Sequence, residues 1–242
     1  MNSKVRDNGF TITELLVVVA VIAILAALLI PTLSRSRDTA YRVACLHHLG
    51  QIELASSMYA MDNSGFLPPH EVSTKWPSQI QPSLEDPRIL LCPIDALDLG
   101  SSPTNFASPF DALPRSYLMN GFYDVFQSRL TASDFAMLQK GLAFAALNES
   151  DIANPSATII FGEKVDTNVF YLNVTEANTA FLNDLAESRH GVQNGSGAFA
   201  GANYGMADGS VTFIAYGQDT SPLNMWGITS ACRTDAAICR PR

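Results

Sequence analysis

A run of 21 residues, 10–30, constrains the fold of this chain more than any other stretch. Its polar members are Thr11, Thr13 and Glu14, and all the others are apolar. An α-helix rises about 1.5 Å per residue, so a helix over this run is long enough to cross about 30 Å of hydrocarbon. The sequence therefore predicts a membrane-spanning helix over residues 10–30.

The residues at the start of this run distinguish it from a plain membrane anchor. Glu14 lies near its beginning, where an unpaired carboxylate in lipid is costly and usually marks a partner or a function. Lys4 and Arg6 belong to a short leader, residues 1–9, that ends in a glycine. An ordinary secretory signal is cleaved after its apolar core. Cleavage after this glycine would instead keep the core and create a new amino group close to Glu14.

The pattern of this segment is dense and specific. From Gly9 the chain reads Gly-Phe-Thr-Ile-Thr-Glu-Leu-Leu-Val-Val, and residues 26–31 read Ala-Ala-Leu-Leu-Ile-Pro. The segment resembles the N-terminal signature of type IV pilins and of the pseudopilins of type II secretion. In that family a prepilin peptidase cleaves after the glycine and methylates the new N-terminal phenylalanine. The resemblance therefore implies cleavage between Gly9 and Phe10 and N-methylation of Phe10.

The resemblance also implies how the chain assembles. Glu14 would pair with the N-terminal amine of a neighbouring subunit, which agrees with the cost of isolating two charges in a medium of low dielectric constant. The implied partners are identical or related pilin subunits in a helical homopolymer, prepilin peptidase and an inner-membrane assembly platform. A plain signal anchor is the alternative, but it explains neither Glu14 nor the glycine before the apolar run.

The same resemblance implies a location. Before assembly the helix would cross the inner membrane once, with the globular domain in the periplasm. After assembly the subunit would lie in a periplasmic pseudopilus or in a filament at the cell surface.

The chain is acidic, with a formal net charge of -8 and a pI of about 4.9. This charge argues against nucleic acid as a partner, because phosphate binding needs clustered Lys and Arg.

The four cysteines suit an exported domain in an oxidising compartment. A disulfide between Cys45 and Cys92 would staple a long loop to the helix and contribute roughly 2–4 kcal/mol. A second between Cys232 and Cys239 would close a small C-terminal loop. Four buried free thiols are the alternative. No Cys-X-X-Cys pair occurs, and none of the spacings is typical of a zinc site.

Apolar residues continue at spacings of three and four beyond the membrane run, which predicts that the helix extends through residues 31–63 as an amphipathic second half. The residues of the predicted apolar face are Leu33, Ala40, Val43, Ala44, Leu46, Leu49, Ile52, Leu54, Ala55 and Met58. Pro31 would kink the helix without ending it. Asp62-Asn63-Ser64-Gly65 supplies a stop signal. The expected organisation is a prepilin leader over 1–9, a transmembrane and assembly helix over 10–30, its amphipathic continuation over 31–63, and an exported globular domain over 64–242.

About 180 residues follow the helix, enough for one domain with its own core. Residues 157–161 and 169–172 read as strands, and residues 203–206 and 211–215 flank an Asp208-Gly209 turn, which is a strong hairpin signal. Thr131-Ala132-Ser133-Asp134 begins a second helix as a capping box, with Phe135, Leu138 and Leu142 on one face. The predicted fold class is α+β, in which the long helix packs on a small antiparallel sheet as in pilins.

Shorter segments beyond the helix extend the likeness. Residues 45–52, 61–69, 91–93, 116–121 and 203–211, with the pair Arg189-His190, are similar to pseudopilin-like proteins of planctomycetes and verrucomicrobia. Those relatives usually have a histidine where Ser210 stands and a shorter gap after the arginine-histidine pair. This chain departs on both points, which weakens any binding role inferred from that motif.

The best cluster of candidate ligands is His190 with Glu163, Asp166 and Asp208. Carboxylates near a turn can hold Ca²⁺, which prefers several oxygen ligands, and the resemblance implies calcium in this part of the domain. Ca²⁺ is therefore the one candidate cofactor, and millimolar Ca²⁺ would then raise the melting temperature. The alternative is structural: Asp208 would serve the turn, and the other carboxylates would form surface ion pairs.

Three functions from different classes remain open. The preferred one is a structural filament subunit that is not an enzyme and has no catalytic residues, since no serine elbow, Walker loop, HExxH or GxGxxG pattern appears. The second is a membrane-anchored exported enzyme that uses His190 and Asp208. The third is a minor tip pilin that binds polysaccharide or secreted cargo through Trp76, Trp226 and the loop over 191–201.

Overall fold

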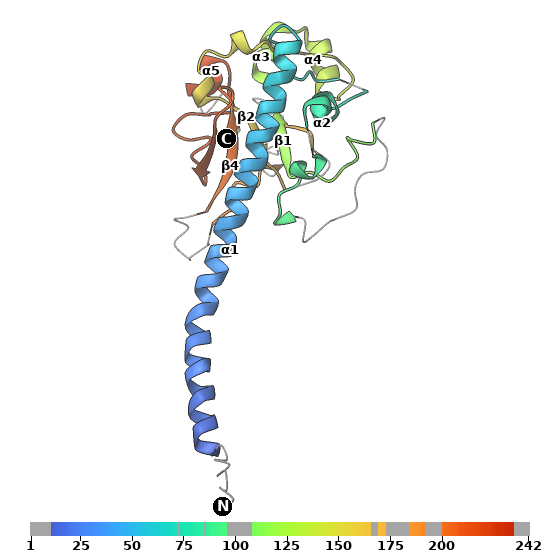
Figure 1. Cartoon of the computed structure of the whole chain (residues 1–242). Coiled ribbons are helices and arrows are strands. Elements are labelled where there is room, and N and C mark those ends of the chain that lie inside the picture. The colour runs from blue at the N-terminus through green and yellow to red at the C-terminus, as the bar shows by residue number, and fades with distance from the viewer. Residues whose placement is uncertain are drawn as a thin grey trace, which may run out of the picture. The chain divides into compact units, whose positions relative to one another are not determined.

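The structure is a computed structural model that describes residues 11–71, 73–84, 86–95, 108–165, 169–172, 184–191 and 200–234. The chain divides into two compact units, Met1–Ala40 and Tyr41–Arg242. The first unit holds the beginning of the long helix α1 (Ile12–Asp62). The second holds the rest of α1 and every strand that the described residues form (Figure 1).

The first unit is helical throughout its described part. Every Ile, Leu and Val from Ile12 to Leu33 is exposed. By length and composition α1 is the one helix among the described residues that could cross a membrane. The helix is continuous through Pro31, although this residue lacks the N–H of a normal helical turn. The hydroxyl of Thr32 donates to the carbonyl of Leu29 at 2.7 Å. The kink at Pro31 stays a prediction.

The end of α1 confirms the predicted stop signal. The helix ends at Asp62, and the chain then passes through left-handed conformations at Ser64 and Gly65, with φ of 58° and 83°. The N–H of Gly65 donates to the carbonyl of Ala60 at 2.8 Å, which satisfies one of the last helical carbonyls. The glycine is suited to this position because it has no Cβ to oppose a positive φ.

The second half of α1 buries only part of the predicted stripe. Leu49, Ile52 and Ala55 are buried as expected, whereas Leu54 and Met58 are 62% and 43% exposed. The buried positions of this half are Cys45, Leu49, Ile52, Glu53, Ala55, Ser56 and Ala60. Since Glu53 and Ser56 are polar, selecting positions by apolar character alone placed part of the face incorrectly.

A mixed five-stranded sheet forms the body of the second unit. Its strands are β1 (Tyr117–Asn120), β2 (Ile159–Glu163), β3 (Tyr171–Leu172), β4 (Gly201–Met206) and β5 (Val211–Ala215), in the order β3-β1-β2-β4-β5. The α+β class is confirmed. The pairs β1–β2, β2–β4 and β4–β5 are antiparallel, whereas β1–β3 is parallel.

The parallel pair corrects the prediction of an antiparallel sheet. The chain reverses after β2, but the outer edge of β2 is already occupied by β4. β3 therefore passes over to the far edge of β1. Since β1 and β2 are antiparallel, a strand that reverses after β2 must run parallel to β1. Strand β1 itself was not predicted as a strand.

The predicted hairpin is confirmed. β4 and β5 pair from Gly201 opposite Ala215 to Gly205 opposite Val211. Gly209 takes φ of 81° in the turn, and the carboxylate of Asp208 accepts from the Ser210 N–H at 3.0 Å. The Asp-Gly pair thus provides both the side-chain acceptor and the left-handed position that a tight connection needs.

Two hydrophobic clusters cover the two faces of the sheet. On one face, Leu49 and Ile52 of α1 pack in the cluster that contains Tyr117 of β1. On the other face, Leu118 packs in the cluster that contains Trp226. The second half of α1 therefore lies over one face of the sheet, as Figure 1 shows, and its Cys45 to Ala60 stripe faces the strands.

Four short helices complete the described fold: α2 (Trp76–Ile80), α3 (Tyr123–Arg129), α4 (Ala132–Gln139) and α5 (Ser230–Thr234). The predicted capping box begins α4, because the hydroxyl of Thr131 accepts from the Asp134 N–H at 3.2 Å. Phe135 and Leu138 are buried as expected, but Leu142 is 53% exposed. It lies beyond the helix end, after Gly141 with φ of 67°.

Candidate functional site

The first candidate site is the N-terminal turn of α1. Thr11 precedes the helix, and its carbonyl accepts from the Leu15 N–H at 3.2 Å. The carboxylate of Glu14 accepts from the backbone N–H and the hydroxyl of Thr11, at 2.9 and 2.7 Å, while the Thr11 hydroxyl accepts from the Glu14 N–H at 3.3 Å. This reciprocal pair is a capping box.

The capping box gives Glu14 a local partner that sequence reasoning missed. The Thr-X-X-Glu pattern at residues 11–14 could have indicated it. Both hydrogen bonds go to one carboxylate oxygen, Oε2, and neither donor neutralises the charge of the carboxylate. A cation from another chain would therefore still find an anionic oxygen at this end of the helix. Gly9 and Phe10, the predicted processing residues, lie outside the described residues.

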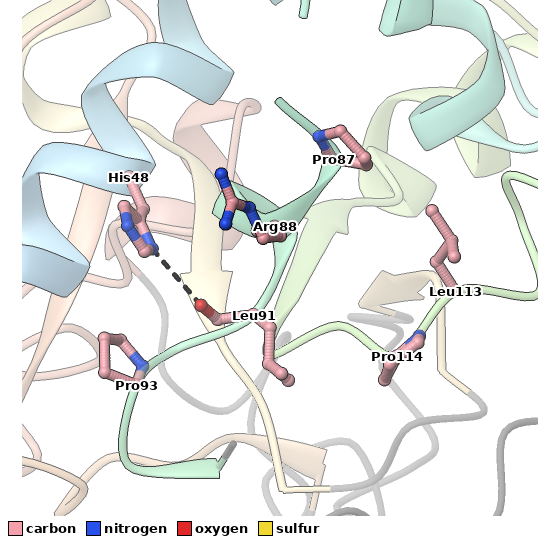
Figure 2. A pocket seen from close by; sticks show the side chains of 7 residues that line it. All are labelled: His48, Pro87, Arg88, Leu91, Pro93, Leu113 and Pro114. Carbon is pink, nitrogen blue, oxygen red and sulfur yellow. Dashed lines mark hydrogen bonds between the residues drawn. The ribbon is translucent and has the colours of Figure 1, made fainter. Parts of the chain in front are cut away.

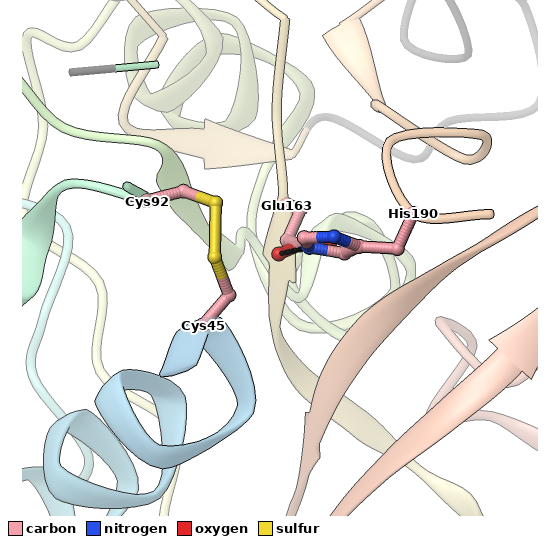
Figure 3. Close-up of side chains that lie close together, drawn as sticks. All are labelled: Cys45, Cys92, Glu163 and His190. Atoms are coloured by element: carbon pink, nitrogen blue, oxygen red, sulfur yellow. Dashed lines mark hydrogen bonds and ion pairs between the residues drawn. A yellow bond between two sulfur atoms is a disulfide. The ribbon is translucent and has the colours of Figure 1, made fainter. Parts of the chain in front are cut away.

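A second candidate site surrounds the disulfide between Cys45 and Cys92, whose predicted pairing is present (Figure 3). The side chains of Glu163, at the end of β2, and of His190, beside β4, are completely buried next to it. The Nε2 atom of His190 and the Oε1 atom of Glu163 are 2.8 Å apart. The second carboxylate oxygen of Glu163 accepts from the Asn203 N–H at 3.0 Å.

Cys232, which we predicted to pair with Cys239, is disulfide-bonded and 1% exposed. Cys239 lies outside the described residues, as does Asp166 of the predicted calcium ligands. The structure therefore describes two of the three carboxylates that we expected to hold Ca²⁺.

These two carboxylates do not meet. Glu163 contacts Asn203 near the start of β4, whereas Asp208 lies in the turn after this strand. The rise along β4 from Asn203 to Met206, its last residue, is roughly 10 Å, and Asp208 lies two residues further along the chain. Hydrogen bonds from the N–H and hydroxyl of Ser210 occupy Asp208 and lower its pKa. Glu163 and Asp208 therefore cannot bind the same ion. Ca²⁺ binding itself stays a prediction.

The same separation removes the proposed His190–Asp208 pair of the enzyme hypothesis. His190 pairs with Gly201 at the start of β4, and its side chain points to Glu163 instead.

A pocket of about 390 Å³ lies away from His190, between α1 and the segments around Pro87 and Pro114 (Figure 2). The described residues that line it are apolar apart from His48 and Arg88, and they include no carboxylate or nucleophile.

The comparisons with known proteins concern the first of these sites. Residues 4–30 match the family model of the prokaryotic N-terminal methylation motif. This chain carries that motif. The matched residues reach from the leader to the end of the exposed apolar run of α1, and the motif thus contains Glu14 and its capping box.

Curated relatives agree over a similar length. The type II secretion system core protein G of Klebsiella pneumoniae is 36% identical over 61 residues, which cover 25% of this chain and 44% of that protein. The type IV wide pilus major component PilA4 of Thermus thermophilus is 43% identical over 59 residues, covering 24% of this chain and 45% of that protein. The chain thus spans less than half the length of these relatives. No solved structure matches it.

Outside the methylation motif, two of the three expected cargo contacts, Trp76 and Trp226, are wrong. Trp76 and Trp226 are both completely buried. The indole N–H of Trp76 donates to the carbonyl of Phe170, and that of Trp226 donates to the carboxylate of Asp219, each at 3.0 Å. Both tryptophans are core residues with satisfied polar atoms. The third expected contact was the loop over 191–201, and most of it, residues 192–199, lies outside the described residues.

The most unusual ionisable group of the second unit was not predicted. Glu53 of α1 is 4% exposed, and its Oε1 atom has no hydrogen-bond partner within the described part of the chain. It lies against Gly205 of β4, where an added Cβ would be 2.0 Å from this oxygen. Burial, and then the negative charges of Asp208 and Glu149, raise the pKa of Glu53 well above its ordinary value.

We expect Glu53 to make folding stability fall as pH rises. In the unfolded chain Glu53 loses its proton near pH 4.5, whereas the folded state keeps the proton until its raised pKa is reached. The stabilising contribution is complete below pH 4.5 and is lost progressively up to the folded pKa. Chemical denaturation of the full chain in detergent should show a free energy of unfolding that falls less steeply with pH in Glu53→Gln than in the wild type.

Glu71→Gln is the control of opposite sign, because hydrogen bonds from Thr74 and Ser73 lower the pKa of Glu71. Its contribution is present above the unfolded pKa and disappears as pH falls. Parallel pH profiles for wild type and Glu53→Gln would show that Glu53 does not carry a raised pKa.

Proposed function

We propose that this chain is a pilin or pseudopilin, a structural subunit of a type II secretion pseudopilus or of a type IV pilus-like filament. The observation that carries the proposal is the methylation motif over residues 4–30, which coincides with the exposed apolar beginning of α1. The helical segment from Ile12 to Leu33, in which every Ile, Leu and Val is exposed, needs a lipid or protein environment, since water does not favour such a surface.

Maturation would follow the pattern of the motif. Prepilin peptidase would cleave between Gly9 and Phe10 and methylate the amino group of Phe10. The first unit would span the inner membrane, with the second unit in the periplasm, until an assembly platform moves the subunit into the filament. A new amine at Phe10 would then lie close in sequence to Thr11 and Glu14.

The exposed beginning of α1 would serve both in the free subunit and in the filament. The Ile, Leu and Val side chains from Ile12 to Leu33 are exposed. They would contact lipid in the free subunit and neighbouring helices in the polymer. Such a contact joins different surfaces of two copies and does not close, so repetition gives a helical filament. Identical or related subunits would therefore be the main partners, and no nucleic acid is needed.

Cargo or polysaccharide binding by a minor tip subunit has no support from Trp76 or Trp226, which lie in the core. An exported enzyme has no support from His190 and Asp208, which lie at opposite ends of β4. Neither alternative is favoured by a specific feature of the described residues.

The test is intact-mass and N-terminal peptide analysis of the chain recovered from its native membrane or from a sheared surface fraction. A mature chain that begins at Phe10 and carries one additional methyl group is the expected result. Recovery of the chain with Met1 and the leader intact from both fractions would refute the proposed maturation. A simple anchor would then be the better description.

A further inference from the structure

The buried surroundings of the Cys45–Cys92 disulfide have the composition of a metal site. One ligand atom from each of Cys45, Cys92, Glu163 and His190 lies within 4.8 Å of all the others. The four residues come from α1, the loop after Leu90, β2 and the segment before β4, and Figure 3 shows their side chains converging. All four are buried, which is unusual for a carboxylate and an imidazole.

The polar atoms of this cluster are not fully satisfied. The Nε2 atom of His190 faces Glu163, but its Nδ1 atom is buried and has no hydrogen-bond partner among the described residues. Buried polar atoms are nearly always paired, so an orphaned ring nitrogen calls for an explanation. Cysteine sulfur, imidazole nitrogen and carboxylate oxygen are also the donor types that proteins use to bind zinc, and this cluster brings all three together.

The set of donor atoms indicates which ion would fit. Two sulfurs, one nitrogen and one carboxylate oxygen suit Zn²⁺, which is held in four-coordinate sites by Cys, His and Asp or Glu at about 2.0–2.3 Å. Two thiolates and one carboxylate supply three negative charges against the two positive charges of the ion. Sequence spacing could not indicate this site, because Cys45 and Cys92 are separated by 47 residues.

We propose that reduction of the Cys45–Cys92 disulfide converts this cluster into a zinc site, with the thiolates of Cys45 and Cys92, an imidazole nitrogen of His190 and the carboxylate of Glu163 as ligands. In the oxidised chain the two sulfurs are bonded to each other and offer no thiolate. The disulfide and the metal therefore exclude one another. Either one links α1 to the loop after Leu90.

The chemistry of the conversion is balanced. A dithiol reductant gives two electrons and two protons to the disulfide, so that Cys45 and Cys92 become thiols and the reductant becomes a disulfide. Zn²⁺ then displaces the two thiol protons, which are released to solvent. A disulfide oxidant reverses the sequence: it takes two electrons from the two thiolates and two protons from solvent and becomes a dithiol, while the S–S bond forms and the ion is released.

The experiment uses the full chain in detergent and Co²⁺ as a spectroscopic probe. The chain is reduced, freed of reductant without air, and titrated with Co²⁺; the oxidised chain is titrated in parallel. We expect the reduced chain to bind one Co²⁺ with a thiolate charge-transfer band and the visible bands of a tetrahedral ion, and to lose them when Zn²⁺ is added. The oxidised chain should show neither band.

Matched variants assign the ligands. Cys45→Ser, His190→Gln and Glu163→Gln should each weaken Co²⁺ binding at least about tenfold, since even loss of an outer partner lowers metal affinity about 10–100-fold. The double variant Cys232→Ser/Cys239→Ser should bind as tightly as the wild type. Equal binding by Cys45→Ser or by His190→Gln would overturn the proposal, because other groups would then hold the ion.

A second measurement keeps the test valid if reduction of the disulfide unfolds the chain. If the reduced chain loses its helical circular dichroism, Zn²⁺ should restore it in the wild type and fail to do so in Cys45→Ser. If the reduced wild type stays folded, Zn²⁺ should raise its melting temperature and leave that of the oxidised chain unchanged. No effect of Zn²⁺ on either property, together with no Co²⁺ bands, would remove the site.

Discussion

Glu14→Ala is expected to leave the leader cleaved and the amino group methylated, but to reduce incorporation into filaments by at least about tenfold. The variant removes the anionic partner proposed for the N-terminal amine of the next subunit. An uncompensated charge in a medium of low dielectric constant costs about 3–5 kcal/mol, and 1.4 kcal/mol corresponds to a factor of ten. Mass analysis of the membrane fraction reports processing, and quantitative immunoblotting of the filament fraction reports incorporation.

The capping box at residues 11–14 calls for a specific control. Glu14 also accepts two hydrogen bonds from Thr11, so Glu14→Ala weakens the first helical turn as well. Thr11→Val removes the hydroxyl and keeps the charge of Glu14. If Glu14 acts by pairing with an amine, Thr11→Val should still assemble. Equal loss in both variants would assign the role of Glu14 to the helix cap, and normal filaments from Glu14→Ala would exclude both roles.

His190→Ala is expected to destabilise the folded chain by about 3–5 kcal/mol. The variant leaves the fully buried carboxyl group of Glu163 without its hydrogen-bond partner 2.8 Å away, and a buried polar group that loses its partner costs about 1–3 kcal/mol, more where it is charged. It also leaves a cavity in the core. The free energy of unfolding of the oxidised chain, measured by chemical denaturation in detergent, reports the effect.

His190→Gln is the matched variant for this experiment. Glutamine can donate a hydrogen bond to Glu163 and fills more of the space, so the loss should be clearly smaller than in His190→Ala. A loss below about 1 kcal/mol in His190→Ala would show that the Asn203 N–H alone suffices to hold Glu163 in the core.

The parts of the fold that sequence predicted are those with a local cause. The stop of α1 at Asp62, the Asp208-Gly209 turn and the Thr131 cap each depend on a few consecutive residues. The membrane run depends on length and composition alone. These signals can be recognised without knowing what any segment packs against.

The features that sequence did not predict depend on which segments meet. The parallel β1–β3 pair follows from β4 occupying an edge of β2, which no local pattern encodes. Glu53 is buried because the helix face is set by the sheet beneath it, where Gly205 leaves room for its side chain. His190 and Glu163 lie in one cluster as predicted. Asp208 lies apart from them because its carboxylate is used in the turn between β4 and β5, and no local pattern shows which end of β4 meets Glu163.

The position of the Cys45–Cys92 bond has a mechanical consequence. Cys45 lies just inside the second unit, close to its first residue, Tyr41. The N–H of Cys92 donates to the hydroxyl of Ser116 at 2.8 Å, and Ser116 directly precedes β1, which lies between β3 and β2 in the sheet. Tension applied along α1 therefore passes through a covalent bond to Cys92, and from there through this hydrogen bond to the residue before β1. The helix turns that follow Cys45 are thereby shielded from being peeled off the sheet.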